Sequence, residues 1–170
     1  IYQQDANKLV EELEGIDIAY LDPPYNQHQY GSNYHMLNTI AKWDKIPVPL
    51  EMNSKGELKE KAGIRHDWVN TRSSYCYKTE AEIAFKDLIN KIDAHYILIS
   101  YSTDGIIPFD TMQEICLSKG KTTIVTNEYT TYRGGKQSNQ RKNTNIEFIL
   151  FGTNLLTWNY KCDIVKRVIL

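Results

Sequence analysis

Two spacings of apolar residues along the chain predict its helices and strands. Apolar residues three and four positions apart are typical of a helix with one buried face. Nearly continuous apolar runs are typical of strands that are covered on both faces. The predicted helices cover residues 6–14, 32–43 and 80–92, the predicted strands cover residues 16–21 and 95–101, and we expect residues 1–5 to end a further strand.

The C-terminal part of the chain shows a different order of elements. A short helix is expected over residues 110–120, with Asp110 as its N-cap. Two strands follow, over residues 121–132 and 145–151, and the polar segment 133–144 between them predicts a β-hairpin with a long tip. Alternation of strand and helix, closed by a hairpin, predicts an α/β fold whose sheet is mostly parallel with an antiparallel C-terminal hairpin.

Residues 44–78 interrupt this regular pattern. The stretch is polar, carries charges of both signs, and includes two prolines and two glycines. It is longer than an ordinary connection between elements. Because 170 residues suit one domain with a substantial core, we predict a single domain over residues 1–170 with an irregular insertion at about 44–78.

Charge and composition limit the kinds of partner and the cellular compartment that we expect for the protein. The chain has 20 Lys and Arg against 21 Asp and Glu, so a nucleic acid would have to bind a local basic patch. Three cysteines without a CxxC pair indicate reduced thiols, and four histidines without ligand spacing argue against a metal site. No apolar run is long enough to cross a membrane and no signal peptide is recognisable, so we expect a cytoplasmic protein without a membrane partner.

The candidate chemistry lies where the first complete strand ends. Residues 16–21 run directly into Asp22, Pro23, Pro24 and Tyr25. Proline suits neither a strand nor a helix interior, so this segment is stiff. In open α/β sheets ligands bind beyond the carboxyl ends of the strands. The segment therefore displays two fixed acceptors, a carboxylate and a proline carbonyl, beside an aromatic ring.

This arrangement suits the exocyclic amino group of a nucleobase. Two acceptors that hold the amino hydrogens favour a pyramidal nitrogen whose lone pair can attack a methyl donor. The ring stacks on the base and keeps it at attack distance. An ordinary turn is the alternative for Asp-Pro alone, whereas the four residues together after a buried strand favour the chemical interpretation.

The sequence "DIAYLDPPYNQHQY" resembles the catalytic motif of the amino-group DNA methyltransferases. The wider sequence, including "YGSNYHMLNTIAKWD" and "HYILISYSTDG", resembles the D12 class of adenine-N6-specific DNA methyltransferases. The resemblance implies a Rossmann-like fold, S-adenosylmethionine as donor, and a flipped adenine of double-stranded DNA as acceptor. It assigns Asp22 and Pro23 to the amino group, includes Pro24 in the catalytic motif, and gives Tyr25 the stacking role.

The resemblance also implies a donor site. "QQDANKL" resembles the acidic motif that precedes the catalytic strand, so Asp5, with Ala6 and Asp22, is assigned to S-adenosylmethionine. A helix N-cap is the alternative for Asp5. The glycine loop that the family uses for the donor has no counterpart, since the chain contains no Gly-x-Gly. We therefore expect the C-terminal portion of a catalytic domain, with the N-terminal part missing or supplied by a partner.

Contacts to DNA are expected from two segments. The hairpin tip has no acid before Glu147 and suits phosphate contacts, and its base offers a second aromatic wall. A solvated loop is the alternative for the tip, and a surface insertion is the alternative for residues 44–78. By resemblance, Ser100 and Tyr101 end the second strand where family members line the pocket, and a buried strand end without a catalytic role is the alternative. The predicted DNA contacts are Tyr132, Arg133, Lys136, Arg141, Lys142, Arg65 and Arg72.

The expected function is N6 methylation of adenine in DNA within a restriction–modification system, with a cognate restriction endonuclease as companion. Two other interpretations fit the same residues. One is a methyltransferase for another base amino group or for RNA, and the other is a catalytically silent DNA-binding module.

Overall fold

The computed structural model of the chain describes residues 1–45, 50–59, 64–130, 144–154 and 167–169. The chain divides into two compact units. Residues 1–27 and 75–170 form the first, which we call the sheet unit, and residues 28–74 form the second, the 28–74 unit. The single domain with an insertion at about 44–78 stays a prediction, and the second unit begins earlier than that insertion.

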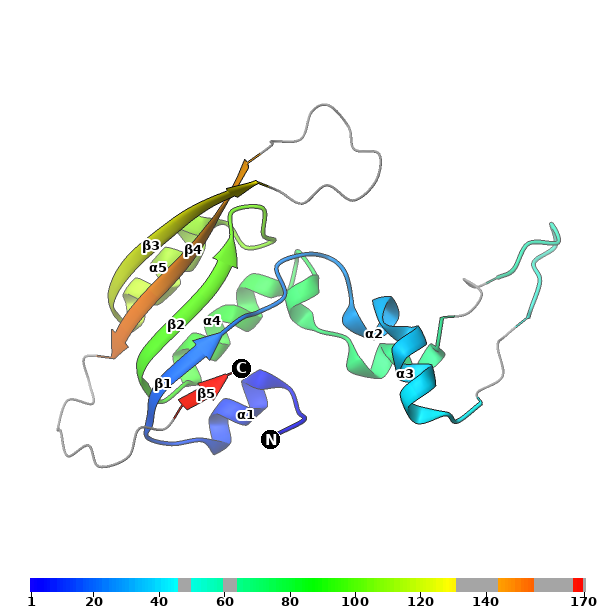
Figure 1. Ribbon diagram of the computed structural model, residues 1–170, viewed down its shortest axis with the longest axis horizontal. Helices are drawn as coiled ribbons and strands as arrows, with labels where there is room; N and C mark the ends of the chain where they lie inside the picture. Colours follow the sequence, from blue (N-terminus) through cyan, green and yellow to red (C-terminus); the bar gives the residue numbers. More distant parts are fainter. Residues whose placement is uncertain (46–49, 60–63, 131–143, 155–166, 170) are drawn as a thin grey trace. The chain divides into compact units, whose positions relative to one another are not determined.

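A mixed sheet runs through the sheet unit (Figure 1). Its five described strands lie in the order β3-β4-β2-β1-β5. β1 pairs in parallel with β2 and with β5, whereas β4 pairs antiparallel with both β2 and β3. The strands are β1 Ile16–Leu21, β2 Ala94–Ser102, β3 Gly120–Thr130, β4 Thr144–Asn154 and β5 Arg167–Ile169.

The α/β class is confirmed, but the parallel part of the sheet is smaller than predicted. Two of the four described strand pairings are parallel and two are antiparallel. The segment between β3 and β4 lies outside the described residues, so the hairpin connection stays a prediction.

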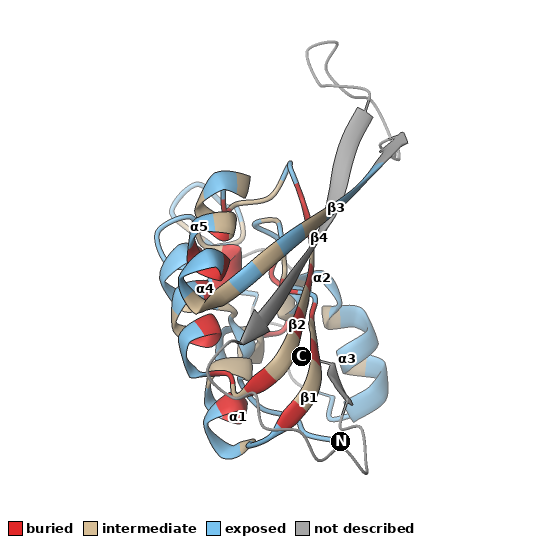
Figure 2. Ribbon diagram, turned by 90° about the vertical axis from the view of Figure 1, so that its left-hand side faces the viewer, coloured by how far each residue is buried: buried red, intermediate tan, exposed pale blue. Residues whose placement is uncertain are grey.

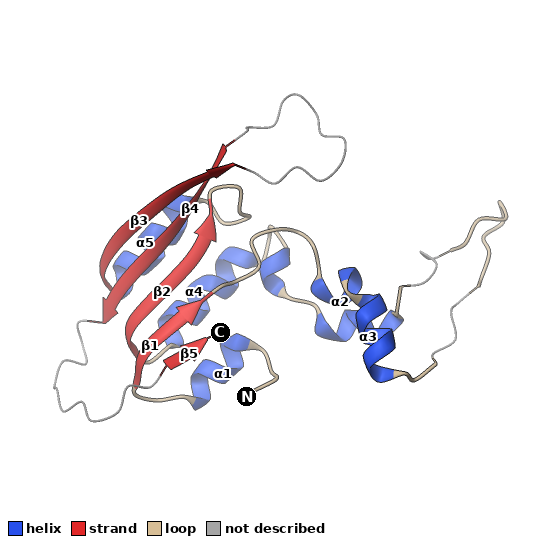
Figure 3. Ribbon diagram, in the orientation of Figure 1, coloured by secondary structure: helices blue, strands red, loops and turns tan. Residues whose placement is uncertain are grey.

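Three helices of the sheet unit cover one face of the sheet. They are α1 Ala6–Glu12, α4 Ala81–Lys91 and α5 Phe109–Lys119. Figure 2 places all three on the same side of the strands, and α4 and α5 lie behind the sheet in Figure 3. Burying the apolar face of each helix against the sheet removes that surface from water, which is the main stabilising term of the unit.

The spacing of apolar residues explains this packing. On α4, Phe85, Leu88 and Ile89 lie on one helical face and are almost fully buried. On β2, Ile97, Ile99 and Tyr101 alternate with less buried neighbours, so they point to the helix-covered face. These side chains belong to one continuous core with Met112 and Ile115 of α5.

Two local predictions in the sheet unit were wrong. Residues 1–5 form no strand, because they are exposed and Asp5 caps α1. Asp110 does not cap α5, because Pro108 occupies the N-cap position and Asp110 lies in the first turn. An acid still suits that turn, where it faces the positive end of the helix dipole.

The 28–74 unit is built from short helices. They are α2 Tyr30–Asn33, α3 His35–Lys42 and the 3₁₀ helix η1 His66–Thr71; a second 3₁₀ helix, η2 Ser74–Cys76, follows where the chain returns to the sheet unit. The single helix predicted over residues 32–43 is therefore divided, with Tyr34 between α2 and α3. α3 ends at Trp43, whose φ of 46° is left-handed.

Side-chain bonds close the 28–74 unit at its two ends. The amide of Gln29 donates to the Ser73 carbonyl at 3.0 Å and accepts from the Ser73 N–H at 2.9 Å. Gln29 is buried, so this pair of bonds satisfies a polar group that has left water. In the part of the chain that the structure describes, no helix has the length and apolar character needed to span a membrane.

Candidate active site

The Asp22–Tyr25 segment leaves the sheet at the carboxyl end of β1. β1 and β2 are parallel there, with Leu21 opposite Ile99, so the segment emerges beside the end of β2 (Figure 1). This is the edge of an α/β sheet at which ligands bind. The sequence analysis predicted the candidate site at the end of β1. The structure adds that β1 and β2 run in parallel, so their carboxyl ends lie at the same edge of the sheet.

Side chains alternate between water and the protein interior along the segment. Asp22 is exposed, Pro23 is buried, Pro24 is half-buried, and Tyr25 is 43% exposed. Among the described residues none forms a hydrogen bond or an ion pair with the Asp22 carboxylate. The carboxylate is thus presented to solvent on a segment that is anchored by its proline.

Tyr25 is held through both its backbone and its ring. Its carbonyl accepts a hydrogen bond from the Ile106 N–H at 2.9 Å. Its ring meets that of Tyr101 edge to face, with centroids 6.5 Å apart and planes at 85°. Edge-to-face contacts of this kind are favourable because the positive ring edge meets the negative ring face.

Asp5 lies at the start of α1 and caps it. Its Oδ1 accepts from the N–H groups of Asn7, at 3.1 Å, and Lys8, at 3.3 Å. Asp5 is therefore the N-cap of α1, as the alternative interpretation predicted. Capping does not exclude the donor contact, because both bonds use the same oxygen, Oδ1, of an exposed carboxylate. Ala6, which follows, is half-buried against the core.

The amide of Asn7 ties the first turn of α1 to α4. It donates to the Ala84 carbonyl and to the Asp87 carboxylate, both at 2.8 Å, and it accepts from the Tyr75 hydroxyl at 2.9 Å. Burial raises the pKa of Tyr75, so its hydroxyl remains a donor at neutral pH. Bonds from Asn7 and Lys91 hold the pKa of Asp87 below its usual value.

Sequence reasoning did not predict the bond between Tyr75 and Asn7. They are 68 residues apart, and Tyr75 is one of 12 tyrosines. No local pattern distinguishes such a pair, because its significance arises only when α1 and α4 pack together.

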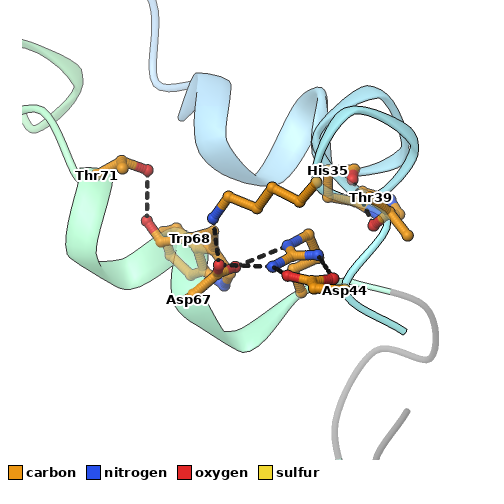
Figure 4. Close-up of polar contacts among 8 residues, drawn as sticks. His35, Thr39, Asp44, Asp67, Trp68 and Thr71 are labelled. Carbon is orange, nitrogen blue, oxygen red and sulfur yellow. Dashed lines mark hydrogen bonds and ion pairs between the residues drawn. The ribbon is translucent and has the colours of Figure 1, made fainter. Parts of the chain in front are cut away.

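Arg65 has a different environment from the one predicted for a DNA contact. Its guanidinium forms a two-pronged pair with Asp44, at 2.8 and 2.6 Å, and a second with Asp67, at 2.9 and 2.8 Å (Figure 4). Lys42 also reaches Asp67 at 2.8 Å. The Arg65 side chain is only 5% exposed. This geometry counts against a phosphate contact and assigns Arg65 to the interior of the 28–74 unit.

The remaining predicted DNA contacts are not tested by the geometry. Arg72 is exposed at the end of η1. The hairpin-tip residues lie outside the described part of the chain, namely Tyr132, Arg133, Lys136, Arg141 and Lys142.

Comparison with known proteins adds a family to this geometry. The family model for D12 class N6 adenine-specific DNA methyltransferases matches residues 1–115, which include the Asp22–Tyr25 segment and β2. The chain is 38% identical over 148 residues to the type II methyltransferase M.NlaIII of Neisseria lactamica. It is 43% identical over 119 residues to the type II methyltransferase M.FokI of Planomicrobium okeanokoites. Over 150 residues it is 35% identical to the modification methylase StsI of Streptococcus sanguinis.

The three matches cover most of the chain but less than half of each relative. They take in 87%, 70% and 88% of this chain, and 40%, 16% and 21% of the three relatives, respectively. The chain therefore corresponds to a part of these longer proteins.

Proposed function

Because the chain belongs to the D12 class N6 adenine-specific DNA methyltransferase family, we propose that the protein transfers a methyl group from S-adenosylmethionine to the N6 amino nitrogen of adenine in double-stranded DNA. The observation that carries the proposal is an exposed carboxylate, Asp22, on a proline-stiffened segment at the carboxyl end of β1. The mixed sheet then corresponds to the Rossmann-like sheet of methyltransferases.

Asp22 and Pro23 act as acceptors for the two amino hydrogens. Holding both hydrogens draws the nitrogen lone pair out of conjugation with the base and directs it toward the methyl donor. Asp22 does not have to remove a proton first, because the amino proton becomes acidic once the nitrogen is methylated. Since Asp22 is exposed, that proton can pass to solvent.

Tyr25 receives the base. An adenine inside a duplex is hidden in the stack, so it must be extruded before its amino group reaches Asp22. The partly exposed ring of Tyr25 offers a stacking surface that offsets part of the cost of unstacking.

S-adenosylmethionine, when bound, supplies the electrophilic methyl group. Asp5 fits this ligand in chemical type, because its carboxylate is exposed and its second oxygen can accept a hydrogen bond from the adenosine part. Asp22 contributes from the end of β1. Asp5 thus combines two roles, capping α1 through Oδ1 and binding the donor through Oδ2.

The relatives suggest the biological setting. Their names describe type II methyltransferases and modification methylases, so we place this protein in a restriction–modification system, in the cytoplasm, with a cognate restriction endonuclease as companion. DNA phosphates would be met by the basic hairpin tip and by Arg72. Arg65 is removed from that set because two carboxylates already hold it.

Identification of the modified base tests the proposal. The protein is expressed at its full encoded length in cells without adenine methylation, and their DNA is digested to nucleosides for mass spectrometry. We expect N6-methyldeoxyadenosine. N4-methyldeoxycytidine alone, or no modified nucleoside, would contradict the adenine assignment.

The Asp22→Ala variant tests the mechanism in the same assay. We expect it to abolish methyl transfer while DNA binding, measured by fluorescence anisotropy, stays within about twofold, because removing one acceptor affects the transition state more than the ground state. Asp110→Ala, which removes an exposed carboxylate elsewhere in the sheet unit, is the matched control and should retain activity. Full activity of Asp22→Ala would refute the assigned role.

A further inference from the structure

Tyr101 lies directly behind the proposed stacking residue. It is the next-to-last residue of β2, is only 3% exposed, and belongs to the core of the sheet unit. Its ring meets that of Tyr25, a residue that is 43% exposed, edge to face. A buried ring therefore packs against the ring of a partly exposed residue.

The turn that follows β2 holds both tyrosines through neighbouring N–H groups. The Ile106 N–H donates to the Tyr25 carbonyl at 2.9 Å, and the Ile107 N–H donates to the Tyr101 hydroxyl oxygen at 3.2 Å. The turn itself is closed by a bond from the Gly105 N–H to the Ser102 carbonyl at 2.9 Å. Backbone and ring of Tyr25 are thus positioned by the same short piece of chain.

Gly105 makes this arrangement possible by its lack of a side chain. A Cβ at this position would overlap Cε1 of the Tyr101 ring and would lie 2.6 Å from Cζ and 2.8 Å from the hydroxyl oxygen. The turn can approach the Tyr101 ring this closely only because residue 105 is glycine. Any larger residue must displace either the ring or the turn.

The Asp22–Tyr25 segment needs such external support. Its two prolines have no N–H, so the segment has few donors with which to anchor itself. Tyr25 is instead held by two contacts: its carbonyl accepts a hydrogen bond, and its ring packs on another ring. The turn after β2 makes the first contact and Tyr101 makes the second.

We propose that Tyr101, with the Gly105 turn packed on its ring, is a positioning residue that sets the place of the Tyr25 ring against the flipped base. The inference rests on the proposed function. Tyr101 touches neither base nor donor in this scheme and acts through Tyr25. Its loss should slow methyl transfer without weakening the binding of DNA or S-adenosylmethionine.

Two substitutions of Tyr101 separate its ring from its hydroxyl. Tyr101→Phe keeps the ring contact and loses the acceptor for Ile107, whereas Tyr101→Leu loses both. In single-turnover methyl transfer on a duplex carrying the mapped target sequence, we expect a fall of about threefold for Phe and about tenfold for Leu. The KM for S-adenosylmethionine and the Kd for DNA should stay within about twofold.

Tyr96 supplies the matched controls. It lies on the same strand, where its ring contacts that of His95 and not that of Tyr25. Tyr96→Phe and Tyr96→Leu should leave the single-turnover rate unchanged. An unchanged rate in Tyr101→Leu, or a parallel loss of rate, donor binding and DNA binding, would overturn the positioning role.

A second variant and a spectroscopic measurement keep the inference testable if Tyr101→Leu fails to fold. Gly105→Ala retains both tyrosines and forces the Tyr101 ring to move. In protein with ¹³C-labelled tyrosine, the Tyr25 ring resonance, assigned by its loss in Tyr25→Phe, should shift in Gly105→Ala and stay in place in Tyr96→Phe. An unshifted resonance overturns the inference. This measurement does not depend on methyl transfer. A failure to find N6-methyladenine would therefore overturn the proposed function and would leave the contact between Tyr101 and Tyr25 to be judged by the resonance alone.

Discussion

At the scale of single residues, the candidate site combines an exposed acceptor with a buried anchor. Asp22 faces solvent while Pro23, the next residue, is buried. A carboxylate in this position keeps its hydration until a ligand displaces the water, so the protein does not bear the cost of burying an isolated charge. The two prolines stiffen the backbone of the segment. They therefore restrict the directions in which the acceptors point, although Asp22 itself is exposed.

Substitution of Tyr25 tests the stacking role. Tyr25→Phe keeps the ring and should retain the single-turnover rate within about threefold, whereas Tyr25→Ala should lower it by about ten- to hundredfold, the worth of one base–aromatic stack. Tyr2→Ala, which removes an exposed tyrosine of the same unit, is the control. Equal activity of Tyr25→Ala and wild type would exclude stacking on Tyr25.

At the scale of elements, the 28–74 unit depends on one buried guanidinium. Arg65 joins Asp44, just beyond α3, to Asp67 in η1 (Figure 4). Bonds from Arg65 and then from Lys42 hold the pKa of Asp67 well below its ordinary value. A carboxylate whose pKa is lower in the folded state stabilises that state above its unfolded pKa, and the contribution is lost as the pH falls.

Acidification should therefore loosen the 28–74 unit. We expect amide protection in residues 28–74, measured by hydrogen–deuterium exchange and corrected for intrinsic rates, to fall as the pH drops below about 4, the ordinary pKa of an aspartate. In Arg65→Ala, protection at neutral pH should already be lower, and acidification should reduce it less than in the wild type, because only Lys42 then remains to lower the pKa of Asp67.

The control for this prediction is Lys59→Ala. The ion pair of Lys59 with Glu51 is exposed, at 55% and 75%, so its removal should change protection little. An Arg65→Ala variant with the acid response of the wild type would show that the Arg65 network does not govern this unit.

At the scale of the whole molecule, the net charge of the chain bears on how the proposed DNA substrate would be bound. A formal net charge of −1 provides no general attraction for a polyanion, so affinity has to come from local basic residues. The proposed substrate site lies at the carboxyl end of β1, which pairs in parallel with β2, and the proposed phosphate contacts come mainly from the segment that follows β3 in the sequence.

The salt dependence of DNA binding measures these contacts. Lys136→Ala and Arg141→Ala should each reduce the slope of log K against log salt concentration by about 1, since each releases about one fewer counterion. Lys86→Ala, an exposed lysine on α4, should leave the slope unchanged. Unchanged slopes in both hairpin variants would remove the tip from the DNA interface.

Local pattern predicted some parts of this structure and missed others for a consistent reason. The strand over residues 16–21 is confirmed residue for residue, and the helix expected over residues 80–92 is found as Ala81–Lys91. Both follow from periodicity within a short window. The environment of Arg65 was not foreseen, because its charge is visible in the sequence whereas its pair with Asp44 joins residues 21 positions apart.

The sequence by itself determined the stiff Asp-Pro-Pro-Tyr segment and its place after a buried strand. These features depend on covalent geometry and on the spacing between near neighbours, and both can be seen in the amino-acid sequence. Only the tertiary structure decided that the ring of Tyr101 contacts that of Tyr25, that Tyr75 bonds to Asn7, and that Arg65 pairs with Asp44. Those relations join residues that pack together although they are distant along the chain, and packing is a property of the folded molecule.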